Sequence, residues 1–156
     1  MSNKLLTIRM RPMVEKSLRV WAAMSDQPRN EAMESALRCG LADAARERGR
    51  DFERAYKSAC QAAIGQTMDS DPMPNAPMVD EAGDVGQGVR RSFLIRSATI
   101  DALNIFAKMA GEAAYRVAND VVFRRILYLA SANGDGFYEA FSQATAYAFN
   151  TVENSK

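Results

Sequence analysis

The chain has 156 residues, of which 47% are apolar and 25% charged, so it can build a real core in one domain or two small ones. It contains no histidine, which removes the commonest general base and the commonest zinc ligand. The net charge is +1, but residues 67–88 hold five of the 19 acidic residues and no basic one, which leaves +6 on the remainder. The rest of the chain is therefore basic although the total is nearly neutral.

Several classes of protein are excluded by what the sequence lacks. No apolar run is long enough to span a bilayer and no signal-peptide pattern opens the chain, so we expect a cytoplasmic protein without a membrane partner. No Gly-rich phosphate loop, metal-ligand cluster or nucleophile–base pairing appears, so we expect no enzyme, no metal and no cofactor. Cys39 and Cys60 stand alone in helical segments; inert reduced thiols are the favoured interpretation, and a disulfide is the alternative.

The first expected element is a strand at residues 5–11, with the sequence LLTIRMR. Its side chains alternate, which is typical of a half-buried strand. One face carries Leu6, Ile8 and Met10, and the other carries Leu5, Thr7, Arg9 and Arg11. Pro12 ends the strand and suits the first turn of a helix.

Three helices are expected after this strand. Helical spacing of apolar residues begins at Pro12, and Asp26-Gln27-Pro28 interrupts it before a second helix. Arg29 and Asn30 lie in the first turn of this second helix, where exposed N–H groups favour a phosphate; an ordinary solvated helix end is the alternative. Gly49 marks a break before a third helix that reaches about residue 64.

The second half of the chain begins after an expected linker at residues 67–88, whose prolines, glycines and acids oppose regular structure. RRSFLIR, at residues 90–96, is a second basic strand-like stretch. Helical patterns follow to residue 110 and over about 113–130. A turn at Asn133-Gly134-Asp135-Gly136 precedes a last amphipathic helix at 137–150.

Strand, helix, break and helix thus occur twice in the same order, at an offset of 85 residues over roughly 36 positions. The offset pairs Ile8 with Phe93 and Trp21 with Phe106. We therefore divide the chain into a first unit at 1–48, an additional helix at 49–66, the linker at 67–88, a second unit at 89–131, and a C-terminal helix and tail at 132–156.

The chain resembles the ribbon-helix-helix family of DNA-binding proteins, the class of Arc, MetJ and CopG. The resemblance covers residues 4–41 and 90–127 and is carried by Leu6-Thr7-Ile8-Arg9-Met10-Arg11-Pro12 with Val14, Leu18 and Trp21, then by Asn30, Met33 and Leu37. It implies that two units intertwine, that their strands pair as an antiparallel ribbon, and that the ribbon's outward side chains enter the major groove of double-stranded DNA.

The fold needs two such units, because a single strand has no partner and an open edge is a liability. Both units lie in one chain here. We therefore expect a mainly helical protein with a short antiparallel β-ribbon, in which tandem ribbon-helix-helix units form an intramolecular pseudodimer with extra helices. This layout resembles the tandem proteins of conjugative plasmids, such as TraY. The molecule is then a monomeric pseudodimer or a higher oligomer.

The resemblance also implies a set of DNA-contacting residues. The expected base contacts are Thr7, Arg9, Ser92 and Leu94, and the expected phosphate or flanking contacts are Lys4, Arg11, Arg29, Asn30, Arg90 and Arg96. Leu94 is unusual on such a face: either it contacts a thymine methyl, or the second strand is shifted by one residue, which would reverse every side chain. The register of the repeat also places Arg91 inward.

Two classes of function remain open. The first is sequence-specific DNA binding, by a repressor of transcription or by an accessory protein of a plasmid-transfer relaxosome that has a relaxase as a further partner. Because the two strands differ, its target would be non-palindromic or imperfectly repeated. The second class is a protein-interaction module, such as an antitoxin or assembly adaptor, with the partner surface on helices 42–64 and 137–150.

Overall fold

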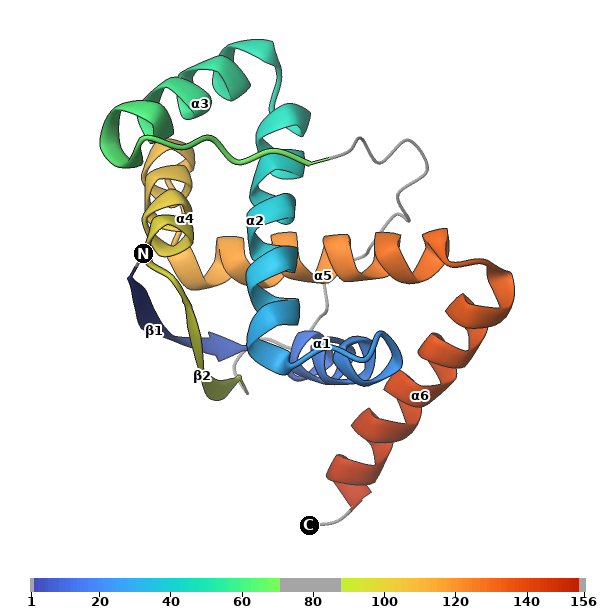
Figure 1. The fold of residues 1–156 in the computed structure, drawn as a ribbon. Coiled ribbons are helices and arrows are strands. Elements are labelled where there is room, and N and C mark those ends of the chain that lie inside the picture. The colour runs from blue at the N-terminus through green and yellow to red at the C-terminus, as the bar shows by residue number, and fades with distance from the viewer. Residues whose placement is uncertain (1, 71–87, 155–156) are drawn as a thin grey trace.

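The computed structural model describes residues 2–70 and 88–154, with side chains at 2–70 and 88–148 (Figure 1). Apart from residues 67–70 and 88, the expected linker at 67–88 therefore lies outside the described residues. The described part is mainly helical with one two-stranded antiparallel sheet. This confirms the expectation of a mainly helical protein with a short antiparallel β-ribbon. Its elements in chain order are β1 (Asn3–Met10), α1 (Pro12–Met24), α2 (Arg29–Glu47), α3 (Arg50–Ile64), β2 (Val89–Arg96), α4 (Ser97–Ala110), α5 (Ala114–Ala132) and α6 (Asp135–Asn154).

The two strands pair with each other within the one chain, and Thr7 lies opposite Ser92 at the centre of the ribbon. Alternate side chains enter the core, as the period of two predicts. The inward, buried residues are Ile8, Met10, Phe93 and Ile95. The register is thus the one given by the 85-residue offset, and a shift of β2 by one residue does not occur.

Arg91 occupies an inward position on β2, and a buried carboxylate on α1 accommodates it. Its Nε lies 3.8 Å from Oε2 of Glu15, which is 3% exposed and also receives Lys16 and Arg19 at 2.8 and 2.9 Å. Burial alone would raise the pKa of Glu15, but the hydrogen bonds and the positive charges of Lys16 and Arg19 together outweigh it and hold that pKa below its usual value. The inward arginine is therefore part of a charged cluster beneath the ribbon.

The repeated order of elements extends beyond the roughly 36 positions expected from the sequence. A strand and three helices occur in the same order twice, and α3 and α6 begin at residues 50 and 135, again 85 apart. Figure 1 shows that each of these helices lies against the first helix of the other half: α6 against α1, and α3 against α4. The expected "additional" helices at 49–66 and 132–156 are thus the equivalent third helices of two similar halves. The last helix also extends beyond the expected range of 137–150.

Equivalent aromatic pairs join these helices. Trp21 and Phe137 meet edge to face with their ring centroids 5.9 Å apart, and Phe106 and Phe52 do so at 5.2 Å. Each member of the second pair is related to a member of the first by the same offset of 85. Edge-to-face pairs of this kind contribute about 0.5–1.5 kcal/mol beyond the area that they bury.

The turn between the first two helices of each half requires a left-handed backbone. Asp26 adopts a φ of 56° after α1, and Gly111, its equivalent, adopts 70° after α4. Asp is one of the few residues other than Gly that enter this region at modest cost. The two halves thus make the same turn with different residues.

The centre of the molecule is the crossing of α2 and α5, and Gly40 permits their close approach. A Cβ atom added at Gly40 would lie 2.5 Å from the backbone oxygen of Val121, so the two helices would have to move apart. Figure 1 shows the two helices crossing at a steep angle, with the ribbon on one side of the crossing and α3 on the other. No helix in the described part of the chain has the length and apolar content that crossing a membrane demands.

Replacing Gly40 with alanine is therefore expected to destabilise the fold, although alanine is the better helix former. Helix propensity favours alanine by about 1 kcal/mol, whereas overpacking a core contact costs typically 1–3 kcal/mol, and here the obstructing atoms are backbone. Because backbone atoms cannot move aside as a flexible side chain can, we expect a cost in the upper part of this range. The net loss in the free energy of unfolding is then up to about 2 kcal/mol, measured by urea denaturation. Gly136→Ala is the matched control, because a Cβ there meets nothing within 4 Å; an equal loss in the control would contradict the close-approach argument.

Candidate functional site

The exposed face of the two-stranded sheet, called here the ribbon face, is the candidate site. It consists of the outward side chains Asn3, Leu5, Thr7 and Arg9 of β1 and Arg90, Ser92, Leu94 and Arg96 of β2. The register places them opposite one another in four pairs along the ribbon: Arg9 with Arg90, Thr7 with Ser92, Leu5 with Leu94, and Asn3 with Arg96. The expected base-contacting residues Thr7, Arg9, Ser92 and Leu94 therefore lie on one surface.

The arginine pair occupies one end of the ribbon face. Arg9 and Arg90 are both exposed and directly opposed, an arrangement that costs stability when like charges face each other across a sheet. Arg9 Nη1 donates a weak hydrogen bond to the carbonyl of Gly88 at 3.4 Å, and a Cβ at residue 88 would overlap the Arg9 side chain. Gly88 thus leaves room for Arg9 beside the ribbon, and two guanidinium groups face solvent together.

The next two pairs along the face differ in chemistry from the arginine pair. The hydroxyls of Thr7 and Ser92 are 2.6 Å apart and hydrogen-bonded, with either able to donate. Leu5 and Leu94 are 68% and 48% exposed. The sequence placed Leu5 on the outward face by its alternation, but it was not assigned a role. Its partner across the ribbon could be identified only from the register.

The two ends of the ribbon are attached to α5 and α2 by equivalent side chains. Asn119 Oδ1 accepts the backbone N–H of Arg11 at 2.8 Å, and Glu34 Oε1 accepts that of Arg96 at 2.7 Å. Asn119 also donates to the carbonyl of Arg9 at 3.0 Å. Positions 34 and 119 are again 85 apart, so each strand end is fixed to the second helix of the other half.

The expected flanking residues differ in their surroundings. Arg11 donates to Asp120 at 3.1 Å and is only partly exposed, so its guanidinium is engaged on α5. Asn30 Oδ1 accepts the backbone N–H of Leu94 at 3.2 Å, and Arg29 lies over the ring of Phe93 at 5.9 Å. Both residues thus place the start of α2 beside β2. Lys4 is exposed near the start of β1.

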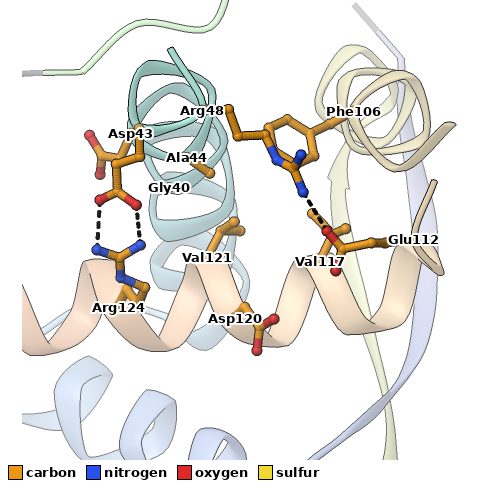
Figure 2. Close-up of a pocket in the computed structure, with 11 residues that line it drawn as sticks. Gly40, Asp43, Ala44, Arg48, Phe106, Glu112, Val117, Asp120, Val121 and Arg124 are labelled. Atoms are coloured by element: carbon orange, nitrogen blue, oxygen red, sulfur yellow. Dashed lines mark hydrogen bonds and ion pairs between the residues drawn. The ribbon is translucent and has the colours of Figure 1, made fainter. Parts of the chain in front are cut away.

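A cleft of about 280 Å³ lies away from the ribbon face, between α2, α4 and α5 (Figure 2). Two of its acidic side chains form ion pairs with arginines. Arg48 pairs with Glu112 at 2.7 Å, and Arg124 binds Glu47 through both of its terminal nitrogens, Nη1 and Nη2. Carboxylates held in this way are poorly placed to act as general bases or metal ligands. Among the described residues, no group of three or more His, Cys, Asp and Glu could hold a metal ion.

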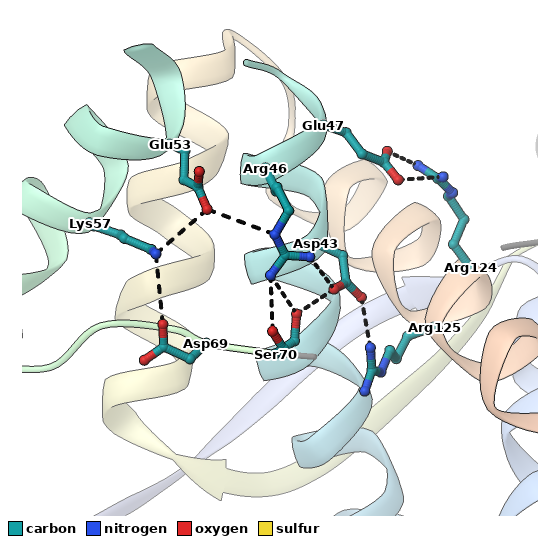
Figure 3. Close-up of polar contacts among 9 residues, drawn as sticks. All are labelled: Asp43, Arg46, Glu47, Glu53, Lys57, Asp69, Ser70, Arg124 and Arg125. Atoms are coloured by element: carbon teal, nitrogen blue, oxygen red, sulfur yellow. Dashed lines mark hydrogen bonds and ion pairs between the residues drawn. The ribbon is translucent and has the colours of Figure 1, made fainter. Parts of the chain in front are cut away.

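Asp43, which also lines the cleft, is the centre of a polar network (Figure 3). Its carboxylate receives Arg125 at 3.2 Å and Arg46 at 3.4 Å, and it accepts a hydrogen bond from the hydroxyl of Ser70. Arg46 also donates to the carbonyl of Ser70 at 3.0 Å. The chain after α3 is thereby attached to α2 and α5, close to where the described residues stop.

Neither cysteine forms a disulfide; Cys60 is buried and Cys39 is partly buried. Burial raises the pKa of the Cys60 thiol, which keeps it protonated and unreactive at neutral pH. Tyr56, one turn away on α3, donates to the carbonyl of Ala102 at 3.1 Å, and burial raises its pKa as well. These groups hold α3 against α4 and have the character of a core contact.

Six of the ten expected DNA-contacting residues thus lie on the ribbon face, and the other four, Lys4, Arg11, Arg29 and Asn30, lie outside it. Comparison of the chain with models of protein families, with curated proteins and with solved structures gives no match.

Proposed function

We propose that this protein binds double-stranded DNA in a sequence-specific manner, with the ribbon face in the major groove. The observation that carries the proposal is the paired, exposed set of arginine and hydroxyl side chains on an antiparallel ribbon formed by β1 and β2. The major groove is about 12 Å wide and admits a two-stranded ribbon. In this proposal the two similar halves act as a tandem ribbon-helix-helix pseudodimer within one chain.

The side chains of the ribbon face match the groups that a major groove presents. Arg9 and Arg90 can each donate two hydrogen bonds to O6 and N7 of a guanine, and each good contact of this kind contributes about 1–3 kcal/mol of discrimination. Thr7 and Ser92 can donate or accept, and so can contact any base edge. A surface ribbon without a binding function would gain no stability from two arginines placed opposite one another, because like charges that face each other across a sheet are destabilising.

Residues around the ribbon supply the contacts to phosphate. Arg29 and Asn30 are at the start of α2, where free backbone N–H groups and the helix dipole favour an anion. Asn30 uses its oxygen to hold β2, but its NH₂ group remains a donor for phosphate. Lys4 and Arg96 lie at the same end of the ribbon. Arg11 would first have to leave Asp120, so it is the weakest candidate of this set.

Selection of bound sequences from random duplex DNA tests the proposal. We expect an enriched motif, and an affinity that falls steeply as salt concentration rises, because phosphate binding releases counterions. Lys4→Ala should reduce the salt dependence by about one unit of slope without changing the motif. Arg54→Ala removes the same charge from the exposed side of α3, far from the strands in Figure 1, and should leave the slope unchanged. A selection without an enriched motif would contradict the proposal.

Two biological settings fit the proposed DNA binding. A repressor and a plasmid-transfer accessory protein with a relaxase partner both need a DNA-reading ribbon of this kind. An antitoxin or assembly adaptor would instead offer α3 and α6 to a partner. One side of each of these helices is already used within the fold, through Tyr56 on α3 and Phe141 on α6, so such a partner would contact the opposite, exposed side.

A further inference from the structure

We infer that the ribbon face is directional: its arginine end reads guanines and its leucine end contacts thymine methyl groups. The protein would then bind a non-palindromic site in one orientation. This inference rests on the proposed DNA binding and specifies which sequence the same face selects.

The direction follows from the order of side chains along the two strands. At positions 5, 7 and 9 the outward residues are Leu, Thr and Arg, whereas at 90, 92 and 94 they are Arg, Ser and Leu. Had both strands carried the same order, antiparallel pairing would place one arginine and one leucine at each end of the ribbon. Because the order is reversed, Arg9 faces Arg90 on one side of the central Thr7–Ser92 pair, and Leu5 faces Leu94 on the other. Beyond the leucines only the pair of Asn3 and Arg96 follows on this face, and we call this half of the face its leucine end.

The leucine pair has the chemistry of a thymine reader. A leucine side chain neither donates nor accepts a hydrogen bond, and the apolar group on the floor of the major groove is the C5 methyl of thymine. Leu5 and Leu94 are among the most exposed large apolar side chains in the described part of the chain. They point from the same ribbon face as the arginines and hydroxyls. The apolar end is therefore continuous with the polar end, which favours one DNA molecule covering both over a separate protein partner.

The geometry also sets the spacing of the two kinds of base. Leu5 and Arg9 are four residues apart on one strand, and a strand rises about 3.4 Å per residue, so about 14 Å separates the leucine pair from the arginine pair. One base pair occupies about 3.4 Å along the DNA axis, so this distance corresponds to roughly four base pairs. We expect thymines on one side of the site, guanines about four base pairs away, and no inverted repeat of the kind that a symmetric ribbon selects.

Removal of single methyl groups from the DNA tests the leucine contact. Replacing thymine with deoxyuridine at the leucine end of the selected site should weaken wild-type binding about fourfold per methyl group lost, as expected for one buried methyl-sized group. The variant with Leu5→Ala and Leu94→Ala should bind the thymine and uracil duplexes equally. If wild type and variant lose the same affinity on the uracil duplex, the leucine contact is overturned.

An exchange of two residues tests the direction itself. Arg90→Leu combined with Leu94→Arg keeps composition and net charge but puts one arginine and one leucine at each end of the ribbon. This variant should select an inverted repeat, whereas wild type selects an asymmetric motif. Circular dichroism and thermal melting confirm that the variant folds; if it does not, the uracil experiment, which uses the wild-type protein, still decides on the leucine contact.

The outcomes separate this inference from the proposal on which it rests. An inverted repeat selected by the wild-type protein would overturn the directional face and leave DNA binding intact. A selection from random duplexes that enriches no motif would overturn both.

Discussion

Replacing Arg9 and Arg90 together with alanine is expected to lower the affinity for the selected DNA site about 100-fold or more, while the free energy of unfolding stays nearly constant. Each arginine that contacts a guanine contributes about 1–3 kcal/mol of discrimination, so two contacts account for a loss of this size. The fold should not suffer, because both side chains are exposed and oppose each other as like charges. Fluorescence anisotropy with the selected duplex and with a scrambled duplex measures the effect.

A control with the same loss of charge separates base reading from general attraction. Arg50→Ala with Arg54→Ala removes two exposed arginines from α3, far from the ribbon in Figure 1. We expect this control to weaken selected and scrambled duplexes alike, and only slightly. The ribbon double variant should instead bind the two duplexes with similar affinity. If the ribbon variant retained the wild-type preference for the selected duplex, Arg9 and Arg90 would not be the base-reading residues.

The ribbon could be predicted from the sequence because the signals that define each strand lie within a few neighbouring residues. Alternation of apolar and polar residues and the Pro12 stop define β1, and the same alternation in residues 90–96 defines its partner. The outward positions of Thr7 and Arg9 follow directly, since a period of two leaves only two faces. The outward Leu94 made the register of the second strand ambiguous. The inward Arg91 is likewise unusual, because a buried arginine is costly unless it is paired. The compensating carboxylate, Glu15, lies on a different element, and no local pattern shows that the two meet.

What the sequence did not predict depends on cross-strand and inter-helix contacts. The pairing of Leu5 with Leu94 needs the exact register of two strands separated by a long stretch of chain. The engagement of Arg11 by Asp120 likewise joins the first half to α5. The alternation of the first strand places Leu5 and Arg11 on its outward face. The residues that lie next to them, Leu94 and Asp120, come from the second half of the chain and decide whether Leu5 and Arg11 are available to DNA.

The full length of the repeat, in contrast, is present in the sequence, and the roughly 36 positions expected for it are too few. The offset of 85 that relates the strands also relates α3 to α6, as Phe52 with Phe137 and Tyr56 with Phe141 show. The expected repeat covers roughly 36 positions and ends after the second helix, where the resemblance to the ribbon-helix-helix family also ends. The third helices are essential to the core nonetheless, because each covers the first helix of the other half.

Replacing Asp43 with alanine is expected to destabilise the protein by about 3–5 kcal/mol, the usual cost of removing one partner from a buried ion pair. Asp43 is 3% exposed and Arg125 is 8% exposed, so the guanidinium would remain buried without its carboxylate. Within the described residues, Nε of Arg125 already lacks a hydrogen-bond acceptor, which makes further loss more costly. Arg46 and Ser70 would lose the same partner. Urea denaturation monitored by circular dichroism measures the change in the free energy of unfolding.

A second substitution shows whether the cost comes from the stranded charge. Combining Asp43→Ala with Arg125→Met removes both buried charges, and apolar replacement of a whole pair is often nearly neutral. We therefore expect the double variant to regain much of the stability that Asp43→Ala loses. Glu112→Ala is the matched control, because its ion pair with Arg48 is a third or more exposed on each side and such pairs contribute about 0–1 kcal/mol. Equal losses for Asp43→Ala and Glu112→Ala would show that burial of the charge does not govern the stability of this network.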